Sequence, residues 1–151
     1  MKITAEEHVA SPKAEVFAAL SEFDSLEERL RRKGVPLERQ PGPQPPELGT
    51  TWNATITWRE RRFEAVAQLV SVEPGTSYAF EWSASGLIAM VVIDLIAVGE
   101  DATRMIASVE GSASNFRAQV LLQSIALARG PLQNRFAAAL AAFARGIDDS
   151  A

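Results

Sequence analysis

The most regular pattern in the sequence is an alternation of apolar and polar residues that begins after Gly49. Trp52, Ala54, Ile56 and Trp58 occupy every second position, and threonine or asparagine residues fill the positions between them. A period of two places all four apolar side chains on one face of a β-strand. The pattern therefore predicts a strand over residues 50–58 with one buried and one solvated face.

Four later stretches also have the composition of strands, and short turn signals separate them. Residues 63–73, 77–84 and 104–110 alternate apolar and polar positions, whereas residues 87–98 are nearly continuous in apolar residues. Because the connections are short, we expect these strands to pair antiparallel as a meander. In the apolar stretch the odd positions are all apolar and the even positions include Asp94, so we expect the odd positions to face the interior.

The beginning of the chain predicts one strand followed by two short helices. Residues 2–10 alternate in part, and Ser11-Pro12 is a strong helix start because serine caps helices and proline fits their first turn. Residues 24–33 predict a second helix that stops at Gly34. Residues 34–49 contain five prolines and predict an extended loop.

The final third of the sequence is helical in pattern. Apolar residues recur at roughly 3.6-residue spacing over residues 116–147. Gly130-Pro131 interrupts them, and proline inside a helix costs about 3 kcal/mol. We therefore expect a kinked long helix, or two segments that meet near Gly130. The whole chain, residues 1–151, predicts a single α+β domain in which a curved antiparallel sheet of about six to seven strands wraps round this long helix.

Several stretches resemble the START-like superfamily, also called SRPBCC. The opening "VASPKAEVFAALSEFDS" has the strand, Ser-Pro, acidic residue and Val-Phe of that family, and "LGTTWNATITW", "LVSVEPGTSYAFEW" and "ATRMIASVEG" lie where the family has its meander. The resemblance implies a helix-grip fold with a hydrophobic cavity between the sheet and the long helix. The superfamily includes a pollen allergen, lipid-transfer domains, polyketide cyclases, quinone-binding proteins and the G-type component of carbon monoxide dehydrogenase, so the fold alone does not select a function.

Charge and composition exclude several classes of partner. The formal net charge is −4, which argues against nucleic acid because phosphate binding rests on clustered Lys and Arg. The chain has no cysteine, which removes disulfides and thiol chemistry. Residues 1–12 have no apolar signal segment, and no apolar run is long enough for a transmembrane helix. We therefore expect a cytoplasmic protein without a transmembrane segment.

The sequence contains no recognisable catalytic constellation. His8 is the single histidine, and no serine has an evident base to pair with it. No metal-ligand spacing and no nucleotide-binding glycine pattern occurs. Glu81, Asp94 and Glu110 fall on the outward register of their strands. We expect no catalytic residues, no metal and no cofactor, and Tyr78 and Arg104 are the polar groups that an enzymatic alternative would use.

Aromatic side chains gather on the predicted inner faces. Large rings opposite an alanine-rich helix either interdigitate or leave a void, and ligand pockets are apolar and concave with few polar groups. We expect a ligand cavity whose lining includes Trp52, Trp58, Phe63, Tyr78, Phe80, Trp82 and, on the helix, Phe136.

Apolar residues also occupy the outward positions of residues 87–98. If the odd positions face inward, Ile88, Met90, Val92 and Ile96 face outward, and Ile106 on the next strand joins them. A contiguous exposed apolar patch indicates a partner surface. We expect a homodimer through Ile88, Met90, Val92 and Ile106 as one use of this face.

Three functions fit these observations. The first is binding or carriage of a small hydrophobic molecule, such as a lipid, a polyketide or a quinone-like compound. The second is a cyclase or dehydratase that uses the same cavity and needs no metal. The third is an assembly or maturation factor that acts through the exposed apolar face. A polar cluster at the cavity floor would favour the enzyme, and a fully apolar cavity would favour the binder.

Overall fold

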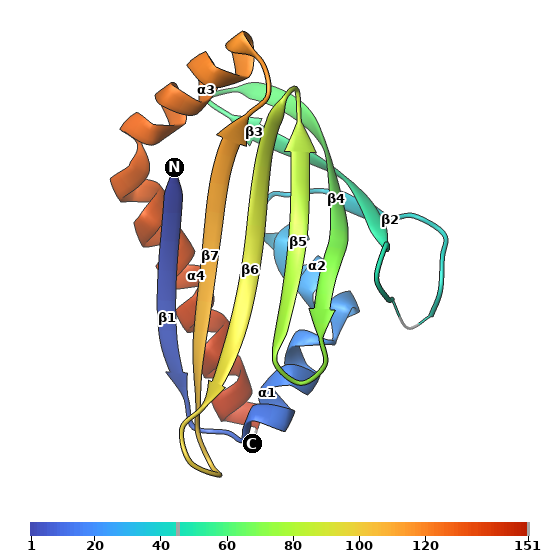
Figure 1. Ribbon diagram of the computed structural model, residues 1–151, viewed down its shortest axis with the longest axis vertical. Helices are drawn as coiled ribbons and strands as arrows, with labels where there is room; N and C mark the ends of the chain where they lie inside the picture. The colour runs from blue at the N-terminus through green and yellow to red at the C-terminus, as the bar shows by residue number, and fades with distance from the viewer. Residues whose placement is uncertain (45, 151) are drawn as a thin grey trace.

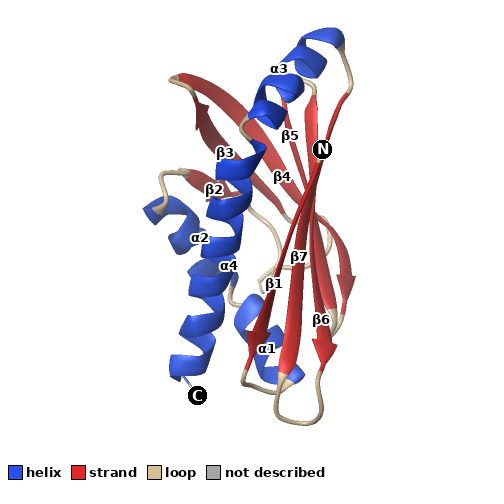
Figure 2. Cartoon of the chain, turned by 90° about the vertical axis from the view of Figure 1, so that its left-hand side faces the viewer, coloured by secondary structure: helices blue, strands red, loops and turns tan. Residues whose placement is uncertain are grey.

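The computed structural model describes residues 1–44 and 46–150 of the chain. It contains one curved antiparallel sheet of seven strands with four helices on the concave side (Figures 1 and 2). The α+β helix-grip architecture expected from the sequence is confirmed. In chain order the strands are β1 (Lys2–Val9), β2 (Leu37–Arg39), β3 (Thr51–Trp58), β4 (Arg61–Glu73), β5 (Ser77–Ala84), β6 (Leu87–Ala97) and β7 (Thr103–Ala113).

The meander is continuous from β2 to β7, and β1 closes the other edge. The strand order is β1-β7-β6-β5-β4-β3-β2, with every neighbouring pair antiparallel. The β2 strand lies inside residues 34–49, for which the prolines predict a loop only. It is a short edge strand in which Arg39 pairs with Trp52. The prolines flank this strand rather than interrupt it, so its backbone can still pair.

The helices are α1 (Lys13–Leu20), α2 (Phe23–Arg32), α3 (Phe116–Leu127) and α4 (Arg129–Ser150). The expected long C-terminal helix is therefore two helices, which meet at Ala128 rather than at Gly130-Pro131. Pro131 lies in the first turn of α4, where a missing backbone N–H breaks no intrahelical hydrogen bond. Asn115 caps α3 by accepting a 2.8 Å hydrogen bond from the Ala118 backbone.

Helix α4 lies across the concave face of the sheet, with α1 and α2 beside its lower half (Figure 2). Helix α3 leaves its axis at an angle and covers the upper end of the sheet (Figures 1 and 2). This arrangement produces the internal space expected between sheet and helix. None of the helices formed by the described residues is long and apolar enough to cross a membrane.

One row across the sheet alternates large rings with small side chains. Trp52 pairs with Ala67, Ala67 with Trp82, Trp82 with Ala89, and Ala89 with Gly111. Directly opposite residues on antiparallel strands place their side chains on the same face. The tryptophan rings therefore project over small neighbours, and the row leaves space on the concave side instead of a filled layer.

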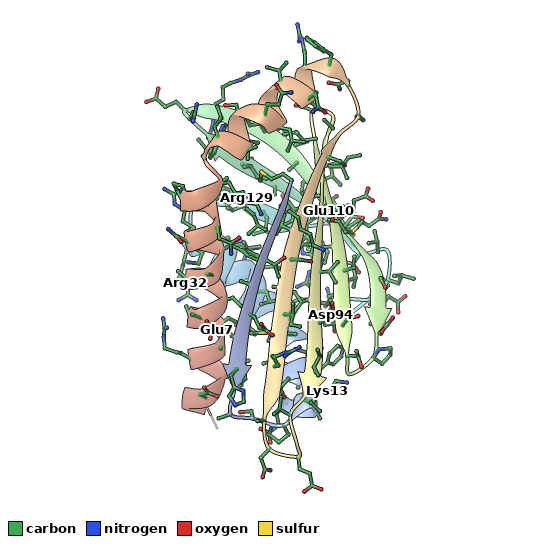
Figure 3. All side chains as sticks on the ribbon, turned by 60° about the vertical axis from the view of Figure 1, so that its left-hand side comes forward. Glu7, Lys13, Arg32, Asp94, Glu110 and Arg129 are labelled. Atoms are coloured by element: carbon green, nitrogen blue, oxygen red, sulfur yellow. The ribbon has the colours of Figure 1, made fainter. Side chains whose placement is uncertain are left out.

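The apolar outer face of β6 is smaller than the sequence predicted. Ile88, Met90, Val92 and Ile106 are all partly buried, and none of them is fully exposed. Met90 pairs with acidic residues on both neighbouring strands, which are Glu81 and Glu110. The expectation of a contiguous exposed patch is wrong because the flanking strands carry polar side chains beside this strip. Figure 3 shows Asp94 and Glu110 on this face.

Candidate functional site

Two chambers lie between the concave face of the sheet and the helices. The α2 chamber has a volume of about 340 Å³ and lies between α2, α4 and the sheet. The α3 chamber has a volume of about 350 Å³ and lies between α3, the first turns of α4 and the upper end of the sheet. Each is large enough for a small organic ligand by the usual range of binding pockets.

Apolar side chains dominate the walls of both chambers. The α2 chamber is lined by Leu20, Phe23, Leu26, Glu27, Arg29, Leu30, Lys33, Leu37, Trp52, Ala67, Phe80, Trp82, Val91, Ile93, Ala107, Val109, Phe136, Ala139, Leu140 and Phe143. The α3 chamber is lined by Met1, Ile3, Ile56, Trp58, Phe63, Ala65, Trp82, Ser83, Ala84, Leu87, Ile88, Ala89, Val109, Gly111, Leu121, Leu122, Ile125, Leu132 and Phe136.

The two chambers adjoin at three residues. Trp82, Val109 and Phe136 line both of them. Trp82 and Val109 come from the sheet and Phe136 comes from α4 on the opposite side. A partition made of side chains moves by rotamer changes rather than by backbone rearrangement. The chambers are therefore two compartments of one apolar space, separated by side chains alone.

The α2 chamber contains one buried ionic cluster, centred on Glu27. Its Oε2 atom accepts hydrogen bonds of 2.8 Å from Trp52 Nε1 and 2.6 Å from Arg39 Nε. Arg39 Nη2 also reaches Asp24 at 2.7 Å. The cluster connects α2 with strands β2 and β3 and holds the mouth of this chamber in shape.

The Arg39 guanidinium is held in its charged form. Burial disfavours charge on it, but hydrogen bonds and Coulomb attraction to Glu27 and Asp24 outweigh this effect and raise the pKa of Arg39. A charge buried beside opposite charges and hydrogen-bonded to them is the arrangement that proteins tolerate. The pair therefore remains ionic beside an apolar cavity.

Basic side chains border the α2 chamber at its outer end. Arg29 and Lys33 contribute to its lining, and the Arg29 guanidinium carbon lies 5.2 Å from the ring centre of Phe143. A guanidinium over an aromatic face is a cation–π contact. Acidic residues are also close, because Arg29 borders a neighbouring polar hollow together with Glu15 and Glu22.

The α3 chamber contains a hydrogen-bond donor that the protein does not use. Trp58 Nε1 is buried and has no hydrogen-bond partner among the described residues. Arg59 and Arg61 stack on two rings of this chamber's wall, with guanidinium carbons 5.3 Å from the Trp58 ring centre and 5.2 Å from that of Phe63. A buried donor without a partner costs about 1–3 kcal/mol. An acceptor atom of a bound molecule would remove that cost.

Solved structures with the same architecture were found, although no protein-family model and no curated protein sequence matches the chain. A norcoclaurine synthase mutant from Thalictrum flavum, in complex with a transition-state analogue, is 18% identical with a TM-score of 0.70, and the match covers 99% of this chain and 95% of that one. The ZhuI aromatase/cyclase from Streptomyces sp. R1128 is 10% identical with a TM-score of 0.68, covering 98% and 93%.

A protein from Thermus thermophilus is similar over 100% of this chain and 99% of its own, at 12% identity and a TM-score of 0.69. The chain has the START-like helix-grip fold. The resemblance seen in the sequence is therefore confirmed at the level of fold. Sequence identities this low carry the architecture and not the activity.

Six of the seven side chains predicted to line a cavity border the chambers of this helix-grip fold. Trp52 and Phe80 line the α2 chamber, Trp58 and Phe63 line the α3 chamber, and Trp82 and Phe136 line both. Tyr78 lies outside both chambers. Its ring stacks on Phe17 at a centroid distance of 4.9 Å, and its hydroxyl is 2.7 Å from Ser21 Oγ. Tyr78 is a core residue because α1 packs directly over its position on β5.

Sequence reasoning missed the Glu27 cluster. The apolar side of α2 was expected to consist of Leu26 and Leu30, but Glu27 lies four residues after Phe23, on the same side of the helix. Arg39 was assigned to a loop, so no partner for Glu27 was visible. The i, i+4 spacing from Phe23 to a glutamate was the available signal, and it indicates a buried carboxylate only when a cation lies opposite.

Other polar groups lie away from the chambers. His8 is exposed on β1, opposite Arg104 on β7, and does not line either chamber. Within residues 1–44 and 46–150, no group of three His, Cys, Asp or Glu side chains could hold a metal ion. The chemistry of the site therefore consists of apolar walls, the Glu27–Arg39 pair, the cations Arg29 and Lys33, and the free Trp58 donor.

Proposed function

We propose that this protein binds a small, mainly apolar molecule in the space formed by the α2 and α3 chambers. The observation that carries the proposal is the pair of adjoining apolar chambers, which share Trp82, Val109 and Phe136. Open apolar space of this size has a favourable free energy of filling, because a ligand removes both its own and the protein's apolar surface from water. Lipids, polyketides and quinone-like molecules have the required chemistry.

The polar groups support a more specific description of the ligand. The unpaired Trp58 N–H favours a molecule with a carbonyl, ether or hydroxyl oxygen at the end held by the α3 chamber. An apolar body would then extend past Trp82 and Phe136 into the α2 chamber. Few polar contacts with a large apolar area are the usual composition of such sites.

Intrinsic fluorescence provides a direct test, because all three tryptophans of the chain line the chambers. Anilinonaphthalene sulfonate added to the protein should quench tryptophan emission through energy transfer and bind saturably. Ala139→Phe places a ring in the α2 chamber, and Ala89→Phe places one in the α3 chamber. Each should weaken probe binding by about tenfold or more while stability changes by about 1 kcal/mol or less, since the ring enters open space.

Ala138→Phe is the matched control, because Ala138 is exposed on the same helix as Ala139. It should leave probe binding unchanged. If the two filling variants unfold the protein or bind the probe normally, the chambers are not the binding site. Native mass spectrometry of the purified protein, followed by solvent extraction, would then identify any natural ligand that is retained.

A cyclase or dehydratase is the second candidate, and the Glu27–Arg39 pair at the wall of the α2 chamber is the observation that favours it. A carboxylate and a guanidinium beside an apolar cavity can exchange a proton with a bound ketone and stabilise its enolate. The Glu27 Oε2 atom already accepts from Trp52 and Arg39, which favours binding over catalysis. Glu27→Gln should abolish turnover of an aromatic polyketide substrate if the enzyme alternative is right, and leave probe binding unchanged in either case.

Self-association through Ile88, Met90, Val92 and Ile106 remains a proposal, as does the assembly-factor function that would use the same face. The partial burial of these four residues leaves a strip on one strand. Light scattering at micromolar concentration tests the dimer, and a monomeric mass would exclude it. Cytoplasmic location and the absence of nucleic-acid binding are proposals of the same standing.

A further inference from the structure

Helix α3 is apolar on two opposite sides. Its inner side contributes Leu121, Leu122 and Ile125 to the lining of the α3 chamber. Its outer side carries Phe116, Val120 and Leu127, whose exposed fractions are 82%, 51% and 87%. A surface helix normally has a polar outer face. The outer side of α3 therefore needs an explanation that packing within this chain does not provide.

The three exposed residues form one stripe along the helix. Val120 lies four residues after Phe116, and Leu127 lies seven residues further, which returns to the same side at 3.6 residues per turn. Phe116 and Leu127 are more exposed than every other large hydrophobic residue that the structure describes, and the next is Leu48 at 62%. We call Phe116, Val120 and Leu127 the α3 stripe.

The region around the α3 stripe is positively charged, although the whole chain has a net charge of −4. Residues 111–147 contain no Asp or Glu, and their arginines are Arg117, Arg129, Arg135 and Arg145. Arg129 lies where α3 meets α4 (Figure 3). The stripe is therefore set in the part of the sequence that has no acidic residues at all.

A second basic group lies at the same end of the molecule. The turn between β3 and β4 projects at the upper end beside α3 (Figures 1 and 2), and both elements contribute residues to the α3 chamber. The turn region carries Arg59, Arg61 and Arg62, together with the acids Glu60 and Glu64. No ion pair is found for these three arginines among the described residues. Exposed aromatic and leucine side chains next to arginine are the composition of surfaces that bind to membranes.

We propose that the upper end of the molecule, formed by the α3 stripe and the arginines of the β3–β4 turn, docks on an anionic lipid surface. Such a surface complements both features, because acyl chains take up apolar side chains and lipid phosphates attract arginine. A second copy of this chain fits less well, since a symmetric contact would bring the same arginines of two copies together. The α3 chamber borders this end, so docking would place the chamber next to the bilayer. The inference goes beyond the proposed function and does not depend on ligand binding.

Vesicle flotation of the full chain tests the proposal. Vesicles of equal parts phosphatidylglycerol and phosphatidylcholine should carry the protein, vesicles of phosphatidylcholine alone should carry much less, and added salt should weaken binding to the anionic vesicles. The double variant Phe116→Ser, Leu127→Ser should lower the partition coefficient by about tenfold or more. The double variant Arg62→Gln, Arg117→Gln should lower it on anionic vesicles and remove most of the salt dependence.

The matched control is Leu48→Ser, Val98→Ser, which removes two exposed apolar side chains elsewhere on the molecule. It should float like the wild type. The proposal is overturned if the wild type does not bind anionic vesicles, or if the control and the stripe variant lose binding equally. Analytical ultracentrifugation distinguishes the remaining case, because a wild-type dimer that the stripe variant dissociates, without vesicle binding, would assign the stripe to self-association. Circular dichroism confirms that each variant is folded.

Discussion

The indole nitrogen of Trp52 donates a 2.8 Å hydrogen bond to Oε2 of Glu27, which joins the sheet to α2 at the wall of the α2 chamber. The same oxygen accepts from Arg39 at 2.6 Å, and the side chains of Glu27 and Arg39 are only 10% and 12% exposed. A pair this buried is stable while it is complete, and removal of one partner leaves an uncompensated charge.

Glu27→Leu should therefore destabilise the protein by about 3 kcal/mol, because Arg39 and the Trp52 N–H both lose their acceptor. Urea unfolding measures the change. Glu27→Leu combined with Arg39→Met should recover much of it, since the buried charge is then absent from both sides. Glu28→Gln is the control, because Glu28 is 58% exposed and its ion pair with Arg31 is long at 3.7 Å. A cost for Glu27→Leu no larger than that of the control would contradict the structural role of the cluster.

Trp58→Phe removes a buried donor that has no partner among the described residues, while it keeps an aromatic ring in the α3 chamber. The unliganded variant should lose no more than about 1 kcal/mol of unfolding free energy, because the unpaired N–H contributes an unfavourable term to the wild type. Differential scanning calorimetry tests this expectation. Among ligands, a ketone should bind about tenfold more weakly to the variant than to the wild type, whereas the matching hydrocarbon should bind both equally. Equal losses for the two ligands would show that the N–H does not contact the ligand.

Trp52→Ala and Trp82→Ala should differ in their effect on stability. Trp52 is 4% exposed and packs against Phe23 and Phe80, so its truncation should cost about 3–5 kcal/mol. Trp82 is only partly buried and borders open space on two sides, so its truncation should cost clearly less, about 1–2 kcal/mol. Urea unfolding of both variants provides the comparison. Trp82→Ala should also open the partition and improve binding of a longer probe, and equal costs for the two variants would mean that the chambers are filled in solution.

Gly86 sets the position of α3 through its contact with the helix cap. Gly86 has a φ of +86°, and a Cβ there would lie 2.1 Å from Asn115 Nδ2 and 3.2 Å from Ala118 Cβ. Gly86→Ala should therefore cost about 2–4 kcal/mol and displace the start of α3. Gly75→Ala is the matched control, because Gly75 has a φ of +76° with nothing within 4 Å of a Cβ. The control should cost about 1 kcal/mol from backbone strain alone. Hydrogen exchange over α3 would locate the difference, and equal costs would place no constraint on α3.

Local periodicity in the sequence determined most of the architecture. The alternation at Trp52, Ala54, Ile56 and Trp58 predicted both the strand and its inward face, and the odd positions of β6 were correctly assigned to the interior, where Leu95 is buried. These predictions succeed because the direction of a side chain in a strand depends on its position along the strand. The helix–sheet layering followed because one long apolar helix was the available cover for one apolar sheet face.

The tertiary structure decided what each inward side chain contacts. Tyr78 and Trp82 share one face of β5, yet α1 covers the first, whereas the second borders both chambers. Glu27 and Arg39 form a buried pair because a short edge strand places them together across 12 residues of chain. The outer face of α3 is apolar in the sequence as well, but the periodicity of residues 116–147 did not distinguish the side that faces the chamber from the side that faces solvent. Periodicity is a property of neighbouring residues, whereas burial, ion pairing and exposure depend on segments that are distant in the chain and meet only in the folded protein.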